Sequence, residues 1–134
     1  MSDRVHAEEL LNRYSLAYDT ADPETLGRCF TEDAVFSMQL PGKDLVSFET
    51  REGIVKLITD SLAAQTDQRR HINTNLIVTP RADGGFDTSH YLTLVATENG
   101  EIRLISAGIY RSRMVESGGE LLIKSLHLDL DRPY

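Results

Sequence analysis

Three glycine-containing turn signals divide the second half of the chain into regular segments. They lie at residues 82–85 (ADGG), 99–100 (NG) and 116–120 (ESGGE). Asn-Gly and Gly-Gly pairs supply the positive φ angles that tight β-hairpins need. We therefore predict that the chain from Gln68 onward forms four antiparallel strands in a meander.

The first half of the chain predicts three helices and one strand. Apolar residues between Ser2 and Asp19 follow a helical period, with Ser2 or Asp3 as the expected N-cap. Asp22 as a cap and Pro23 at the first helical position indicate a second, short helix. The remaining elements are expected as a strand over 33–40 (DAVFSMQL) and a helix over 48–65.

Helices followed by a run of strands are typical of an α+β fold. We expect three N-terminal helices packed on one curved antiparallel β-sheet. A chain of 134 residues, 40% of them hydrophobic, is long enough for one core and too short for two ordinary domains. A single domain over residues 1–134 is therefore predicted.

Charge and hydropathy exclude several classes of partner. The net charge is −7, and the one tight basic pair, Arg69-Arg70, is flanked by Asp67, so we expect no nucleic-acid surface. The segment MSDRVHAEELL is charged from its third residue and has no apolar stretch, so no export signal is expected, and no run of about 18 apolar residues indicates a membrane span. Cys29 is the only cysteine, which predicts a small buried residue, no internal disulfide and a cytoplasmic location.

The segment QRRHINTNLIV, residues 68–78, has polar residues at every second position of an expected strand. Alternation would direct one set of side chains to one face and the other set to the opposite face. The two sets are His71, Asn73, Asn75 and Ile77, and Ile72, Thr74, Leu76 and Val78. The face that carries His71 is expected to be solvent-exposed or functional, with Asn73 and Asn75 as structural hydrogen-bonding residues.

Two phrases, YDTADPETLGRCFTEDAVF and RRHINTNLIV, carry a resemblance to a known superfamily. Together with the order of elements, they resemble the cone-shaped nuclear-transport-factor-2-like (NTF2-like) fold and, within it, the SnoaL-like group. The more specific match is a pair, Asp19 at the end of the first helix and His71 before the TN dipeptide. Scytalone dehydratase, hexachlorocyclohexane dehydrochlorinase and bile-acid dehydratases look similar at both positions, where they have a catalytic Asp-His dyad.

This resemblance implies a cofactor-independent lyase or isomerase, similar to a dehydratase, with no metal. His71 would remove a carbon-bound proton, and Asp19 would fix the tautomer of its ring and stabilise the imidazolium. The residues themselves leave a plainer alternative open. A strand histidine is often only a hydrogen-bonded residue, and Asp19 could simply begin the DTAD turn.

Further site residues are expected from the family and from spacing. Tyr14 and Tyr18 lie on one helix face and, with Tyr110 and Met38, are candidates for substrate binding. An apolar pocket for a small hydrophobic molecule, such as a cyclic one, is expected to be lined by Phe36, Met38, Ile58, Leu94 and Ala96. We expect His90 to be a core or dimer-interface residue, and His6 and His127 to be structural or exposed residues.

Departures from each relative restrict the reaction that the resemblance implies. Met38 stands where ketosteroid isomerases have their proton-shuttling aspartate and near a tyrosine of scytalone dehydratase, whose second histidine is replaced by Ala96. The lysine and arginine of the dehydrochlorinase correspond to Tyr14 and roughly Leu126. Because position 38 is not an aspartate, steroid isomerisation with such a base is not expected. The missing lysine and arginine argue against halide abstraction.

The residues are also compatible with two other functions. One is a non-catalytic module of the same fold that binds a small ligand or serves for oligomerisation. The other is the small subunit of a complex similar to ring-hydroxylating dioxygenases. Strands with apolar residues on both faces predict self-association, and the family resemblance implies a homodimer or homotrimer.

Overall fold

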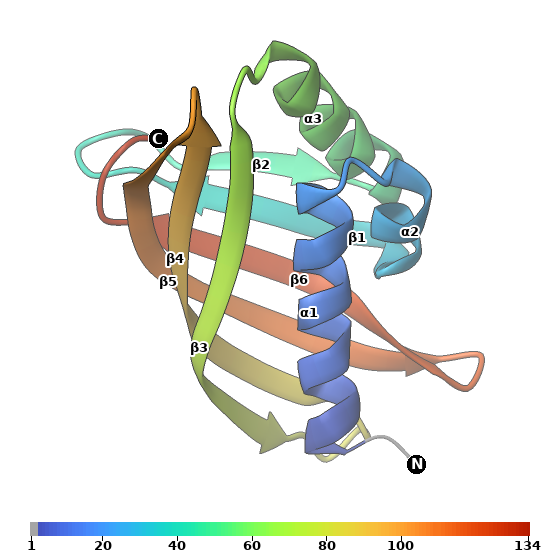
Figure 1. The fold of residues 1–134 in the computed structure, drawn as a ribbon. Coiled ribbons are helices and arrows are strands. Elements are labelled where there is room, and N and C mark those ends of the chain that lie inside the picture. The colour runs from blue at the N-terminus through green and yellow to red at the C-terminus, as the bar shows by residue number, and fades with distance from the viewer. Residues whose placement is uncertain (1–2) are drawn as a thin grey trace.

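The computed structural model describes residues 3–134 and confirms the α+β architecture (Figure 1). Three helices lie on one side of a strongly curved six-stranded sheet. The elements in chain order are α1 (Arg4–Asp19), α2 (Pro23–Arg28), β1 (Phe30–Gln39), β2 (Val46–Glu49), α3 (Arg51–Ala64), β3 (Gln68–Pro80), β4 (Phe86–Glu98), β5 (Glu101–Ser117) and β6 (Glu120–Leu130). No helix within residues 3–134 is long and apolar enough to cross a membrane.

The predicted meander is present as β3 to β6, with each strand antiparallel to the next. The connection between β4 and β5 shows why the turn signal works. Asn99 and Gly100 have φ angles of 52° and 78°, the conformation that a tight hairpin needs at both central positions. The local sequence was therefore sufficient to predict these hairpins.

The rest of the sheet differs from the prediction in two ways. Its strand order is β2-β1-β6-β5-β4-β3, and β1 pairs with β6 in parallel, so the sheet is not wholly antiparallel. The short strand β2 pairs with β1 and was not predicted, because Phe48 and its neighbours were assigned to the following helix. The parallel pairing joins segments far apart in the chain, which the residues of one strand do not encode, whereas β2 follows β1 after a short loop over residues 40–45.

The helices begin at side-chain caps. Asp3 Oδ1 accepts a hydrogen bond from the backbone N–H of His6, and Asp22 Oδ1 accepts one from that of Thr25. These bonds satisfy backbone donors that have no partner within the helix. The caps at Asp3 and Asp22 are therefore confirmed, whereas the alternative cap Ser2 lies outside the described residues.

A β-bulge in β3 changes which residues face the helices. Pairing with β4 is regular as far as Thr74 and resumes at Ile77, and Asn75 between them has a φ of 59°. An extra residue in one strand reverses the alternation of the side chains beyond it. His71 and Asn73 face inward as expected, but beyond the bulge Leu76 and Val78 do so, while Ile77 is 63% exposed. The predicted placement of Asn75 and Ile77 on the His71 face was therefore wrong.

The core lies between the helices and the concave face of the sheet. Leu10 and Leu11 of α1 and Ile54 and Ile58 of α3 are buried there. Cys29 is also buried, as expected, and burial raises the pKa of its thiol to about 11. The helix α1 runs along β3, while α3 contacts β1 and β2 at the opposite edge of the sheet (Figure 1).

Candidate active site

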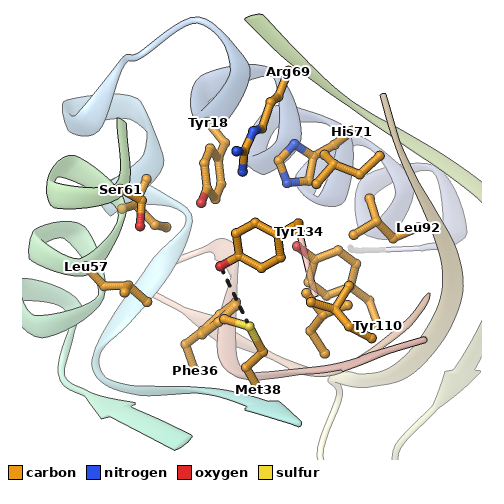
Figure 2. Close-up of a pocket in the computed structure, with 14 residues that line it drawn as sticks. Tyr18, Phe36, Met38, Leu57, Ser61, Arg69, His71, Leu92, Tyr110 and Tyr134 are labelled. Atoms are coloured by element: carbon orange, nitrogen blue, oxygen red, sulfur yellow. Dashed lines mark hydrogen bonds between the residues drawn. The ribbon is translucent and has the colours of Figure 1, made fainter. Parts of the chain in front are cut away.

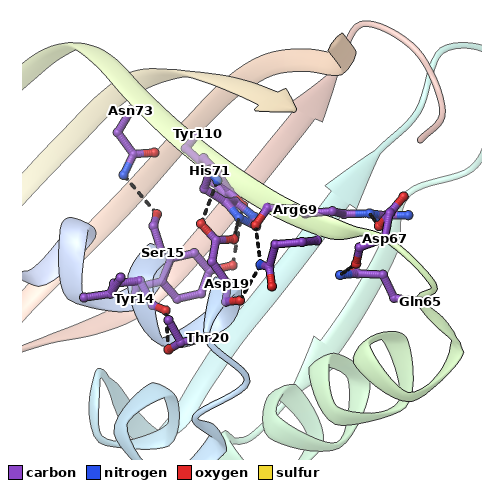
Figure 3. A network of polar contacts seen from close by, with 12 residues as sticks. Tyr14, Ser15, Asp19, Thr20, Gln65, Asp67, Arg69, His71, Asn73 and Tyr110 are labelled. Carbon is purple, nitrogen blue, oxygen red and sulfur yellow. Dashed lines mark hydrogen bonds and ion pairs between the residues drawn. The ribbon is translucent and has the colours of Figure 1, made fainter. Parts of the chain in front are cut away.

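Asp19 and His71 meet where α1 ends beside the start of β3 (Figure 3). Nδ1 of His71 lies 2.6 Å from Asp19 Oδ1, and the backbone N–H of His71 donates to Asp19 Oδ2 over 2.8 Å. The two side chains are only 5% and 7% exposed. One carboxylate therefore holds both the ring and the backbone of the histidine.

The local structure explains why these two residues are brought together. The backbone N–H of Thr20 closes the end of α1 by donating to the Leu16 carbonyl oxygen over 2.9 Å. The side-chain amide of Gln68 then donates to the Asp19 carbonyl oxygen over 2.8 Å, which ties the helix end to the first residue of β3. Strand alternation turns His71 toward α1, so its ring meets the carboxylate.

The contact to Asp19 determines the protonation pattern of the imidazole ring. A carboxylate only accepts hydrogen bonds, so Nδ1 of His71 must carry a proton to make this one. In the neutral ring the other nitrogen, Nε2, then has a free lone pair. His71 lines a cavity, and Figure 2 shows a ring nitrogen directed into it. The arrangement therefore offers a base to a molecule in the cavity.

The cavity lies under the curved sheet between β3 and α3 (Figure 2). Its enclosed space is small: about 30 Å³ is open to the centre of a water-sized sphere, and the total is about 490 Å³ only when all the space between the walls and the solvent at the open mouth are counted. Most of its walls are apolar or aromatic. The lining residues are Tyr18, Phe36, Met38, Leu57, Ile58, Ser61, Arg69, His71, Leu92, Leu94, Tyr110, Leu128, Leu130 and Tyr134.

Four of the five predicted apolar lining residues are in the cavity wall. Phe36, Ile58 and Leu94 line it together with Met38. Ala96 does not: it is fully buried further along β4, so that expectation was wrong.

The predicted tyrosines occupy two layers. Tyr18 and Tyr110 line the cavity, and the Tyr18 ring packs against His71 with 4.6 Å between ring centres. Tyr14 is not in the wall but lies behind it, with its hydroxyl 3.4 Å from the Tyr110 hydroxyl. Burial raises the pKa of Tyr18 to about 12 and raises the pKa values of Tyr14 and Tyr110 as well. All three phenols are therefore protonated donors at neutral pH.

Two further polar side chains, Asn73 and His90, are held behind the cavity wall. The Asn73 amide donates to Ser15 Oγ over 2.9 Å, the structural role expected of this residue. His90 is 3% exposed and stacks on the Tyr110 ring, with 5.1 Å between ring centres. Burial, helped by the nearby positive charge that His71 can carry, lowers the pKa of His90 to about 4. His90 is therefore a neutral core residue that supports Tyr110 and does not line the cavity.

The remaining histidines lie away from the cavity. His6 contacts its cap residue Asp3 on the surface, with 2.9 Å between Nδ1 and Oδ1. His127 points to the outer side of β6, where Nδ1 lies 2.6 Å from Ser37 Oγ and Nε2 lies 3.0 Å from Asp129 Oδ1. Both match the expectation of structural or exposed residues.

Sequence reasoning missed several polar residues of the cavity wall, above all Arg69, Ser61 and Tyr134. For Arg69 a signal was present, because it lies two residues before His71 and strand alternation places both on one face. Ser61 and Tyr134 reach the cavity from α3 and from beyond β6, and no spacing rule connects them to His71. Within the described part of the chain, no group of three or more His, Cys, Asp or Glu side chains is placed to hold a metal ion.

Known structures share this architecture over nearly the whole chain. ActVI-ORFA from Streptomyces coelicolor has a TM-score of 0.81 at 22% identity, covering 95% of this chain and 96% of that one. A protein from Catenulispora acidiphila, solved in complex with S-DNPA, has a TM-score of 0.81 at 24% identity, covering 94% and 91%. The β subunit of a putative aromatic-ring-hydroxylating dioxygenase from Novosphingobium aromaticivorans reaches 0.83 at 18% identity, covering 98% and 90%. At these identities the likeness establishes the NTF2-like fold alone.

Sequence comparison is more specific than these structural matches. A comparison with curated proteins gives no match. The family model of the SnoaL-like domain, in contrast, matches residues 1–127. The chain therefore belongs to the SnoaL-like domain family.

Proposed function

We propose that the protein is a cofactor-independent lyase or isomerase, similar to a dehydratase, that removes a carbon-bound proton from a small hydrophobic substrate. The observation that carries this proposal is the 2.6 Å contact between His71 Nδ1 and Asp19 Oδ1 beside an apolar cavity. It leaves Nε2 of His71 as the one basic nitrogen of that ring available to a ligand.

The chemistry follows from the positions of these groups. Nε2 takes a proton from a carbon next to a carbonyl group, and Asp19 stabilises the imidazolium that forms. The electron pair of the broken C–H bond moves into an enolate, whose oxygen accepts a hydrogen bond from a cavity phenol such as Tyr110. The enolate then expels a hydroxyl group from the next carbon, which leaves as water with the proton of His71, or it is protonated at another carbon.

The cavity wall indicates the kind of substrate. Phe36, Leu92, Leu94 and Leu128 offer apolar surface without a charge, which favours a hydrophobic, cyclic or aromatic molecule. A structural relative solved in complex with S-DNPA supports the use of this fold for ligand binding.

A deuterium-exchange screen tests the proposal. The protein would be incubated in deuterium oxide with tetralones and with β-hydroxy ketones of one or two rings, and mass spectrometry would record deuterium uptake and loss of water. We expect at least one compound to exchange or to dehydrate faster than without protein. Compounds that bind in the cavity by NMR but neither exchange nor dehydrate would instead favour the non-catalytic binding module.

A further inference from the structure

We propose that the substrate carries a carboxylate and that Arg69 is its anchor. This inference deepens the proposed function and rests on it for the identity of the site, because it names the substrate class that the His71 cavity takes. Among the described residues that line the cavity, Arg69 alone has a permanent positive charge, and none is acidic. An apolar cavity with one cation suits an amphipathic molecule with a hydrophobic body and one anionic group.

Arg69 is held in place by two neighbours. Its Nε donates to Asp67 Oδ1 over 2.9 Å, and the two side chains are 22% and 11% exposed. The Tyr134 ring lies against the guanidinium group, whose central carbon is 5.3 Å from the ring centre. The positive charge also reaches Tyr18, since it opposes the rise in the Tyr18 pKa that burial causes. The side chain is therefore positioned before a ligand arrives.

The terminal nitrogens of Arg69 remain available to a ligand. Within residues 3–134, the structure shows a hydrogen bond of this side chain only at Nε. A guanidinium group has five N–H donors in a fixed fork, and its two terminal nitrogens match the two oxygens of a carboxylate. Asp67 balances the charge of the empty site while leaving that edge free, so the pair stays neutral until an anion binds.

Strand geometry places the anchor and the base on one wall of the cavity. Arg69 and His71 are two residues apart on β3 and pair with Ala96 and Leu94 of β4. Residues at this spacing point to the same face with Cα atoms about 7 Å apart. A ring system between the two groups can place its carboxylate at Arg69 and its acidic carbon at Nε2 of His71. Hydrophobic cyclic carboxylic acids that also have a ketone next to the acidic carbon are therefore the expected class.

A pair of probes of equal shape tests this inference without needing turnover. Naphthaleneacetate and its neutral amide, naphthaleneacetamide, would be titrated into the protein and followed by calorimetry. We expect the carboxylate to bind about tenfold or more tightly than the amide, because a charge-assisted hydrogen bond is stronger than a neutral one. Equal affinities, or no binding of either probe at millimolar concentration, would overturn the inference.

Variants show which cation is responsible. Arg69→Gln should abolish the preference for the carboxylate, whereas Arg70→Gln makes the same change in net charge on the exposed face of β3 and should retain it. Because Arg69→Gln leaves the carboxylate of Asp67 without its partner, the double variant Asp67→Asn/Arg69→Gln serves as a second test and should also lack the preference. Retained preference in a folded Arg69 variant would exclude Arg69 as the anchor.

The His71→Ala variant separates this inference from the proposed function. A carboxylate held by Arg69 keeps its preference when His71 is removed, but one held by a charged imidazolium loses it. Loss of the preference in His71→Ala would therefore contradict the anchor, while the exchange rate of the same variant tests the base separately. A retained preference with unchanged exchange activity would support the anchor and remove the base.

Discussion

At the scale of single residues, the central feature is the two-point contact of Asp19 with His71. One oxygen accepts from the ring and the other from the backbone, so the ring cannot turn without losing its partner. Such a carboxylate serves mainly to fix the tautomer and to stabilise the protonated ring. Asp19 is therefore expected to matter for the rate more than for substrate binding.

Replacing this carboxylate by an amide is the first prediction. In Asp19→Asn, the side chain can donate to Nδ1 of His71, which moves the ring proton to Nε2 and removes the free lone pair from the cavity. Turnover should fall by about 10²–10⁴-fold. NMR of isotope-labelled histidine should show the ring proton on Nδ1 in the parent protein and on Nε2 in the variant. A parent ring protonated on Nε2 alone would contradict this assignment.

His90 provides a prediction for the pH dependence of stability. Burial lowers its pKa from 6.5 to about 4 in the folded protein, so the unfolded chain binds this proton more readily. The contribution of this pKa shift to the free energy of unfolding is fully present above about pH 6.5. It is lost as the pH falls toward 4, by up to about 3 kcal/mol.

The variant His90→Phe keeps a flat ring against Tyr110 and removes the titrating group. Chemical unfolding at about pH 7 and about pH 5 should show a smaller loss of stability in the variant than in the parent protein. Identical losses in the two proteins would mean that His90 does not titrate differently on folding.

The candidate site could be predicted from the sequence only where a family pattern existed. Asp19 and His71 were identified because their motifs recur together, and strand alternation correctly turned His71 inward. Arg69 followed the same alternation but was not identified, since its partner Tyr134 comes from a distant segment. Tyr14 was predicted to line the cavity but lies behind its wall. Helical spacing indicates which face of the helix a residue is on, but not how deeply the residue is buried.

At the scale of secondary structure elements, local signals were reliable and long-range pairing was not. The caps at Asp3 and Asp22 and the hairpin at Asn99-Gly100 each depend on a few neighbouring residues. The parallel pairing of β1 with β6 and the bulge at Asn75 depend on how the sheet closes around its core.

Two glycines within these elements should respond oppositely to substitution by alanine. A Cβ on Gly108 in β5 would clash with the backbone carbonyl oxygen of Asp129 in β6, so Gly108→Ala should lower the free energy of unfolding by about 1–3 kcal/mol. Gly53 in α3 has only an ordinary contact nearby, so Gly53→Ala should raise it by about 0.5–1 kcal/mol. Denaturant unfolding would measure both, and a neutral Gly108→Ala would argue against the close approach of β5 and β6.

At the scale of the whole molecule, the outer face of the sheet is the main apolar surface that the helices leave uncovered. Ile72, Tyr91, Ile102 and Leu104 on β3, β4 and β5 are 43%, 51%, 73% and 68% exposed. Their pairing partners Thr93, Ile109, Thr97 and Val95 belong to the same outer face. We propose that this face packs on a second copy of the chain.

Light scattering at micromolar concentration should therefore give a dimer or trimer. Leu104→Glu places a charge in the proposed interface and should shift the protein toward the monomer. Leu16→Glu is a matched control, because Leu16 is 64% exposed on α1, away from the outer face. A monomeric parent protein, or equal effects of the two variants, would contradict association through the sheet.

The most direct test of the central claim is the rate of exchange or dehydration by His71→Ala, on a compound that the parent protein converts. If Nε2 of His71 is the base, the rate should fall by about 10²–10⁴-fold while the fold and ligand binding persist. His127→Ala, which removes a histidine outside the cavity, should keep the parent rate. Full activity in folded His71→Ala would contradict the proposed mechanism.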